Sequence, residues 1–224
     1  MVFTIDFDLL NKARGVLSVR EKLYWIVGGA GSGKTTVCRN LSARDGLPVY
    51  DMDAHIYGSY HSRFTPERHP VNFAWSTSEN GLAWLLAMSW DEFNSFNQAA
   101  LPEYLDLLAE DVADSSPTSP LLIDGGICNP ALLNHVIPAR QIICLSAPLD
   151  ITVWESADRQ SMKDEIYKLP NPEAAWMKFL DFDKKITQAI EKECQENNIS
   201  LCRMTSTTSV GDFAKEVAFL MGLQ

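Results

Sequence analysis

The feature that most constrains this chain is the stretch from Leu23 to Thr36, where an apolar run ends abruptly in a glycine-rich loop. The apolar run Leu23–Val27 predicts a buried strand, and the segment Thr35–Ala43 that follows the loop predicts a helix. The loop matches the pattern G-x-x-x-x-G-K-[ST] at Gly28, Gly33, Lys34 and Thr35. A strand, such a loop and a helix in this order predict a cradle for phosphate groups.

Each part of this loop suits a nucleotide. Glycines let backbone N–H groups converge on phosphate oxygens without Cβ clashes, and the helix adds its positive N-terminal end. We expect Lys34 to reach the β- and γ-phosphates, and Thr35 to offer its hydroxyl to a magnesium ion bridging them. An ordinary glycine-rich turn would leave the Lys-Thr pair unexplained. The predicted nucleotide-binding residues are Gly28, Gly29, Ala30, Gly31, Ser32, Gly33, Lys34, Thr35 and Thr36.

Length and composition predict a globular protein. The chain has 224 residues, 46% of them hydrophobic, which suits a single domain over residues 1–224. No run approaches the roughly 18 apolar residues that span a bilayer. The first eight residues are acidic where a secretory signal would be basic. We therefore expect a cytoplasmic protein that makes no contact with a membrane.

The five cysteines are odd in number and contain no C-x-x-C pair, so neither a disulfide framework nor a zinc site is expected. Net charge is −10, from 19 basic and 29 acidic side chains. The interval between Arg68 and Arg140 contains no Lys or Arg and would repel nucleic acid. We interpret it as a solvated acidic face. Its acidic residues are Glu79, Asp91, Glu92, Glu103, Asp106, Glu110, Asp111, Asp114 and Asp124.

Strand and helix patterns alternate along the chain. This alternation predicts a three-layer α/β fold, in which helices cover both faces of a five-stranded parallel sheet. Residues 54–120 form a long helical insertion between the second and third strands, and residues from about 155 to 170 form a lid. The expected strands are Leu23–Val27, Leu47–Asp53, Leu121–Asp124, Gln141–Leu145 and Ile199–Met204.

Helix signals predict several boundaries. Thr4 is expected to cap a helix that reaches Arg20. This helix packs against the sheet edge or mediates a homodimer. Ser89 opens a capping box, and Pro102 kinks or restarts the helix that follows. Further helices begin at 148–150 and at Asn171–Glu173, where Asn is the cap and Pro the first helical residue.

Polar residues at or just past the strand ends predict a magnesium-nucleotide site at one edge of the sheet. One prediction for Asp124 is that it binds the magnesium ion, directly or through water. The alternative is that it is an ordinary aspartate of the turn before Gly125. Strand alternation puts Asp51 and Asp53 on the same face. Asp53 orients or deprotonates an attacking hydroxyl group, or caps a helix.

Four cationic side chains are candidates for anion binding. Arg159 and Lys163 lie four residues apart, so on a helix they point the same way. They either close over the nucleotide phosphates or form ion pairs at the surface. Arg63 and Arg68 grip an anionic acceptor, or are ordinary surface arginines. The segment Thr205–Ser209 contacts the base or is a polar loop. Three tryptophans of the insertion line an acceptor pocket or pack in the core: Trp75, Trp84 and Trp90.

With these residues placed, nearly the whole chain resembles the P-loop small-molecule kinases, which include shikimate, gluconate and nucleoside monophosphate kinases. Gly28–Thr35 looks like their phosphate loop, and Asp51–Asp53 is similar to the D-x-D of shikimate kinases. Asp124–Gly126 falls where their third strand delivers its motif. Arg159 sits at the place of a lid arginine, with Lys163 where a second arginine is usual.

The resemblance implies ATP- and magnesium-dependent phosphoryl transfer to a small-molecule acceptor. Lys34, Asp53 and Arg159 would be catalytic, Asp53 would bind the acceptor with Arg63 and Arg68, and magnesium would bind at Thr35 and Asp124. An alternative is a nucleotide-binding switch that hydrolyses ATP or GTP and signals to a protein partner, although no N-K-x-D motif is present. A third is a nucleotide-binding protein without catalysis, with the insertion as an interaction module.

Overall fold

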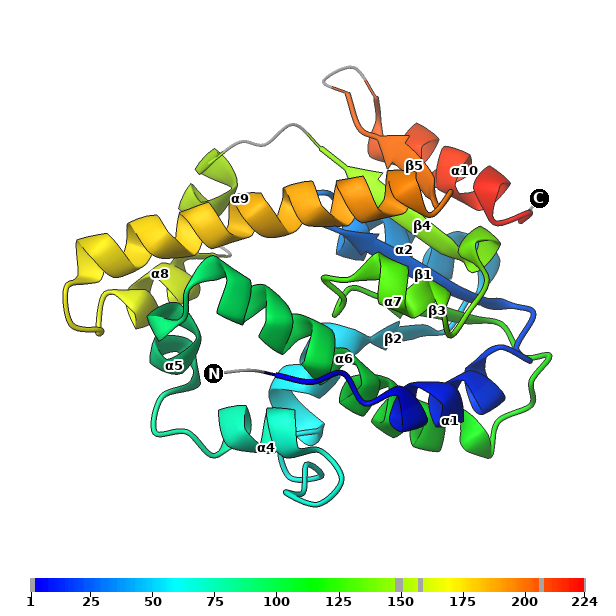
Figure 1. Cartoon of the computed structure of the whole chain (residues 1–224). Helices are drawn as coiled ribbons and strands as arrows, with labels where there is room; N and C mark the ends of the chain where they lie inside the picture. The colour runs from blue at the N-terminus through cyan, green and yellow to red at the C-terminus, as the bar shows by residue number, and fades with distance from the viewer. Residues whose placement is uncertain (1–2, 148–150, 157–158, 206–207, 224) are drawn as a thin grey trace.

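The computed structural model describes residues 3–147, 151–156, 159–205 and 208–223. Five strands within these ranges form one sheet in the order β2-β3-β1-β4-β5, and every neighbouring pair is parallel (Figure 1). The predicted α/β fold with a five-stranded parallel sheet is confirmed. The strands are β1 (Leu23–Gly28), β2 (Val49–Asp51), β3 (Leu121–Asp124), β4 (Ile142–Ser146) and β5 (Ser200–Arg203).

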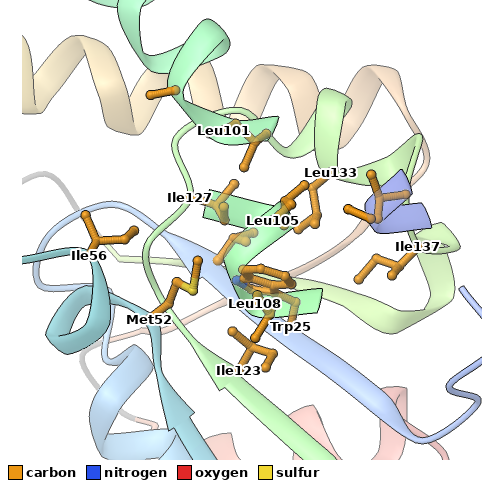
Figure 2. Packing of buried hydrophobic residues seen from close by; sticks show 14 of the residues in the cluster. Trp25, Met52, Ile56, Leu101, Leu105, Leu108, Ile123, Ile127, Leu133 and Ile137 are labelled. Carbon is orange, nitrogen blue, oxygen red and sulfur yellow. The ribbon is translucent and has the colours of Figure 1, made fainter. Parts of the chain in front are cut away.

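Helices cover both faces of the sheet because successive strand residues point to opposite sides. Ile26 and Leu122 belong to a core shared with α2 (Lys34–Asp45) and α10 (Val210–Leu220). Trp25 and Ile123 belong to a larger core on the other face, where Figure 2 shows them beside Leu105 and neighbouring apolar side chains. Helices contributing to this second core include α1 (Phe7–Leu17), α6 (Trp90–Ala113), α7 (Pro130–Asn134) and α9 (Pro172–Glu196). The chain therefore has the predicted three layers.

The segment between β2 and β3 is helical, as predicted. Ser89 and Glu92 form the predicted capping box, since each side chain accepts from the backbone N–H of the other residue. Helix α6 continues through Pro102, so no new helix starts there. The helices of this segment are α3 (Met52–Ala54), the π-helix η1 (His55–Ser59), α4 (Pro70–Ser76), α5 (Gly81–Ala87) and α6.

The acidic interval is not simply a solvated face, because three of its carboxylates are buried, two of them within α6. Glu103 is 1% exposed and accepts hydrogen bonds from the Asn72 backbone N–H at 2.8 Å and its side-chain amide at 2.7 Å. Asp106 is 0% exposed and lies 3.0 Å from Lys12 Nζ and 3.1 Å from His69 Nε2. These bonds join α4 and α1 to α6, so part of the negative charge holds the insertion together.

The N-terminal helix begins later than predicted, at Phe7, and its cap is Asp6 rather than Thr4. Asp6 Oδ1 accepts from the N–H groups of Asp8 and Leu9, both at 2.9 Å. A carboxylate also interacts favourably with the positive helix end, which a threonine hydroxyl does not. The helix packs against α6 instead of the sheet edge, through Leu10, Ala13 and Leu17.

Strand β2 is shorter than predicted, and this changes the position of Asp53. Asp51 caps α3 by accepting from the Ala54 N–H at 2.9 Å, so the chain turns into a helix after Asp51. Strand alternation between Asp51 and Asp53 is therefore wrong.

At α9, Pro172 is the first helical residue as predicted, but the Asn171 side chain makes no capping bond, because this residue is left-handed with φ 55°.

Short elements complete the chain. The 3-10 helix η2 (Ala139–Gln141) precedes β4, while η3 (Ile151–Glu155) and α8 (Gln160–Ile166) lie between β4 and α9, where a lid is predicted. The helix start predicted at 148–150 lies outside the described residues, and the residues that directly follow it form the short 3-10 helix η3. In the ranges that the structure describes, no helix has both the length and the apolar character needed to cross a membrane.

Candidate functional site

The glycine-rich loop leaves β1 in a conformation that requires glycine. Gly28 has φ 148°, and a Cβ there would lie 2.3 Å from the carbonyl oxygen of Leu145 in the neighbouring strand β4. Gly33 is the N-cap residue of α2, so the loop ends at the free N–H groups of a helix start. Loop and helix together form an anion-binding geometry at the carboxyl edge of the sheet.

Lys34 is held within this loop. Its Nζ donates to the carbonyl oxygens of Gly28 and Gly29, both at 2.9 Å. Burial lowers the pKa of Lys34, and the negative charges of Asp53 and Asp124 oppose that shift. The ammonium group is therefore hydrogen-bonded to loop carbonyls and attracted by two nearby carboxylates.

Asp53 lies near Lys34, beside the turn that follows β3. Gly126 has φ 74°, and a Cβ there would lie 2.3 Å from Met52 Cγ. Its N–H donates to the Asp53 carboxylate. A Cβ on Gly125 would lie 2.7 Å from Asp53 Oδ2 and 3.6 Å from Lys34 Cε, which shows that all three residues meet at one point.

Asp53 is an exposed residue whose carboxylate lines a water-accessible cavity, with the Gly125 backbone and Lys34 close to it on one side. Desolvation raises its pKa above the ordinary value, and the positive charge of Lys34 only partly offsets this. A carboxyl group with a raised pKa is poised to exchange a proton with a ligand.

Asp124 ends β3 beside Thr35. It is 4% exposed, and its Oδ1 has no hydrogen-bond partner among the described residues. Burial raises its pKa, while the hydrogen bond from the Thr35 hydroxyl lowers it. A 360 Å³ cavity adjoins both residues and includes Asp51.

A hydroxyl and a carboxylate oxygen are ligands that magnesium accepts, and the unpartnered Oδ1 of Asp124 leaves a site for such an ion. Across the described ranges, no group of three or more His, Cys, Asp or Glu side chains could hold a metal ion. An ion at Thr35 and Asp124 would therefore need oxygens from water or a bound phosphate, which is how magnesium commonly binds.

A second, larger cavity of 580 Å³ opens from the loop at Gly28, Lys34 and Asp53. Its walls come from η1, α4, α5, α6, α8 and α9, so the insertion and the segment after β4 enclose it. The size is typical of small-molecule sites. Its aromatic wall residues are Tyr57, Trp75, Phe93, Tyr104, Trp154, Phe179 and Phe182.

Arg159 lines the same cavity and is positioned by a neighbouring tryptophan. Its guanidinium carbon lies 4.6 Å from the centroid of the Trp154 ring, a cation–π geometry. Trp154 is fixed in turn by donating from Nε1 to Asp183 Oδ2 at 2.8 Å. Lys163 does not accompany Arg159 into the cavity, because its ammonium lies 5.4 Å from the Trp176 ring.

The structure does not bring Arg63 and Arg68 to this cavity. Arg63 pairs with Asp111 at 2.6 Å and with Glu110 at 3.1 Å, and Arg68 forms ion pairs with Glu110 and Asp106. Both arginines are therefore ion-paired with acidic side chains of α6 and do not line the cavity beside Lys34.

The other candidates divide between site and core. Trp75 lines the cavity, whereas Trp84 and Trp90 lie outside its lining and pack against neighbouring aromatic rings. Met204 at the end of β5 approaches the loop, since its Cε would lie 3.2 Å from a Cβ on Gly33. Thr205 and Thr208 share a hydrogen bond at 2.7 Å, and the two residues between them lie outside the described ranges.

Sequence reasoning missed the contribution of α9. A Cβ on Gly29 would lie 2.1 Å from Thr187 Oγ1, so α9 packs directly on the loop. One turn earlier in α9, Asp183 accepts the hydrogen bond from the Trp154 indole. Asp183 falls in the spacing of the apolar stripe that contains Phe179 and Ile186. A carboxylate within an apolar helical stripe is the signal that could have identified it.

Comparisons with known proteins identify no family. A scan against family models gives no match, and a search of the curated proteins gives none. Among solved structures, the crystal structure of TT1252 from Thermus thermophilus is similar with a TM-score of 0.49 and 17% identity, over 89% of this chain and 96% of that chain. This likeness is too distant to bear on function.

The raised pKa of Asp124 predicts a stability cost at neutral pH. The folded protein holds this proton more tightly than the unfolded chain does, so the stabilising contribution exists at low pH and disappears as pH rises through the folded-state pKa. We expect Asp124→Asn to raise the Tm of the free protein at pH 7 by a few degrees, since 1 kcal/mol corresponds to about 2–4 °C at this size. The gain should shrink toward pH 4.

Thermal unfolding followed by circular dichroism measures this effect. Asp181→Asn, at a carboxylate that is 52% exposed, is the matched control and should leave Tm nearly unchanged. An Asp124→Asn protein that melts well below the wild type at pH 7 would show that ionised Asp124 stabilises the free fold.

Proposed function

We propose that this protein is a kinase of the P-loop type, which transfers the γ-phosphoryl group of ATP to a small-molecule acceptor with the help of magnesium. The observation that best supports this proposal is the meeting of Lys34, Asp53 and the glycine-rich loop at the mouth of a 580 Å³ cavity. A phosphate site alone would serve many nucleotide-binding proteins. A proton-exchanging carboxylate facing a separate pocket favours transfer to a second substrate.

In this proposal the loop N–H groups and the start of α2 bind the β- and γ-phosphates. Lys34 exchanges the carbonyl oxygens of Gly28 and Gly29 for phosphate oxygens, so its ammonium stays hydrogen-bonded in both states. Thr35 and the unpartnered oxygen of Asp124 would hold magnesium, which when bound supplies positive charge to the transferring phosphate.

The acceptor hydroxyl occupies the cavity beside Asp53. Its oxygen bonds to the γ-phosphorus while the bond to the β–γ bridging oxygen breaks, ADP leaves, and the hydroxyl proton passes to Asp53. Arg159, stacked on Trp154 at the cavity wall, stabilises the charge on the transferring group. The protein's contribution is mainly the positioning of these side chains in a desolvated site.

Two other activities compete with this one. A switch would hydrolyse ATP or GTP slowly without any acceptor, and a binding protein would hydrolyse neither. ADP release measured with and without a panel of alcohols, sugar acids and nucleotides separates them. Strong stimulation by one compound class supports the kinase, whereas slow release indifferent to every addition supports the switch.

We expect Lys34→Ala to lower kcat by about 10²–10³-fold, because it removes one preorganised donor to the transferring phosphate. Steady-state ADP release in the presence of magnesium and ATP measures the loss. Lys192→Ala, at an exposed lysine on α9, is the control and should keep full activity. Retention of most activity in Lys34→Ala would refute the assignment of the loop.

The proposed role of Asp53 predicts an acid limb in the pH profile. Only the ionised carboxylate accepts the proton, so kcat/KM should rise with pH through the pKa of Asp53. Desolvation raises that pKa, which places the midpoint above the ordinary value of about 3.9. Asp53→Asn should lose this limb and at least ~10²-fold in rate.

Rates measured between pH 4 and 9 in both proteins give this comparison, with Asp181→Asn as an exposed control. If Asp53→Asn kept the wild-type rate and the same limb, another group would be the proton acceptor.

A further inference from the structure

Helix α5 has an unusual environment for its composition. Its sequence is Gly-Leu-Ala-Trp-Leu-Leu-Ala, with no polar side chain, yet none of its residues is fully buried. Leu82, Leu85 and Leu86 of this helix line the 580 Å³ cavity. Apolar surface left in contact with cavity water costs free energy, which a ligand of matching character would recover.

Aromatic rings continue this wall on the neighbouring elements. Tyr57 is 68% exposed although it lines the cavity, and its ring stands edge-on to Trp75 with centroids 5.7 Å apart. The indole Nε1 of Trp75 is buried and has no partner within the described residues, so it can donate to one oxygen of a ligand. Phe93 and Phe182, 4.7 Å apart, add a second aromatic pair.

Charge in the cavity argues against an anionic occupant. Among the described lining residues the cations are Lys34 and Arg159, and both face the phosphate end in the proposed function. The anions are Asp53, Glu165 and Asp183. With Lys34 and Arg159 engaged by the nucleotide in the proposed function, a phosphate monoester or a carboxylate in this pocket would meet these three carboxylates without a further cation, since Arg63 and Arg68 are paired with α6.

We infer that the acceptor is an uncharged aromatic or alicyclic alcohol, bound by the apolar face of α5 and the rings of Tyr57 and Trp75, with its hydroxyl directed to Asp53. This inference rests on the proposed function for the identity of the phosphoryl donor. The binding surface itself does not depend on transfer. Sugar acids, polyols and nucleoside monophosphates are disfavoured by the same wall.

The test compares ligands of one shape and different charge. 2-Naphthylmethanol is the uncharged probe, 2-naphthoate is its anionic counterpart, and glycerol and AMP represent polar acceptors. Calorimetric titration of the full chain, with magnesium and a non-hydrolysable ATP analogue present, measures binding without chemistry. We expect 2-naphthylmethanol to bind and 2-naphthoate to bind at least ~10-fold more weakly. Tighter binding of 2-naphthoate or AMP overturns the inference.

A pair of tyrosine variants tests the wall directly. Tyr57→Ala removes an exposed ring that lines the cavity, so we expect the fold to be kept and affinity for 2-naphthylmethanol to fall about fivefold or more, with ATP affinity unchanged. Tyr167→Ala, at a tyrosine that is 44% exposed and outside the lining, is the matched control. Equal affinity in the two variants would contradict the assigned wall.

ADP release with the same compounds separates this inference from the proposed function. If 2-naphthylmethanol binds but stimulates no release, and no other alcohol does, the transfer proposal fails and the ligand class stands. If AMP or a sugar acid drives release, transfer stands and the ligand class is wrong.

Discussion

The structure depends on placing an ammonium and two carboxylates close together at one edge of the sheet, with Asp124 buried and with Lys34 and Asp53 lining a cavity. Lys34, Asp53 and Asp124 each have a pKa displaced by desolvation, and the attraction between the ammonium and the two carboxylates opposes the shift in each case. Such an arrangement is costly in the free protein. In the proposed function, a bound phosphate and a magnesium ion would offset this cost.

The parallel sheet is what makes this convergence possible. Strand β1 lies between β3 and β4, so the loop after β1 and the turn after β3 leave the same edge side by side. Trp25, buried in the core below, donates from Nε1 to the carbonyl of Gly125 at 2.8 Å and anchors the turn that contacts Asp53. The core thus positions the site through one hydrogen bond as well as through packing.

The sequence predicted the layers, the parallel sheet, the helical insertion and the residues of the glycine-rich loop, because these follow from local patterns that tertiary contacts reinforce. It also named Asp53, but through a strand that does not extend so far. The strand ends at Asp51 because the Asp51 side chain accepts a hydrogen bond from the Ala54 N–H and so caps α3. Periodicity does not distinguish a strand end from a cap.

Other features depended on long-range contacts that a single sequence does not display. Arg63 and Arg68 are paired with α6 more than 30 residues away, and the buried Asp106 contacts a lysine of α1 and an arginine of the turn before α4. The cavity lies between the insertion and α9, and its apolar lining follows from which faces of those helices remain uncovered. Hydrophobic patterns identify an apolar face, but not whether protein or ligand covers it.

A structure of the protein with magnesium and a non-hydrolysable ATP analogue would show whether the glycine-rich loop and Lys34 bind the phosphates. We expect the γ-phosphate in the glycine-rich loop, with Lys34 Nζ moved from the carbonyls of Gly28 and Gly29 onto phosphate oxygens, and with Asp53 across the cavity mouth. Nucleotide bound away from the loop, or Lys34 still hydrogen-bonded to those carbonyls beside a bound nucleotide, would contradict this expectation.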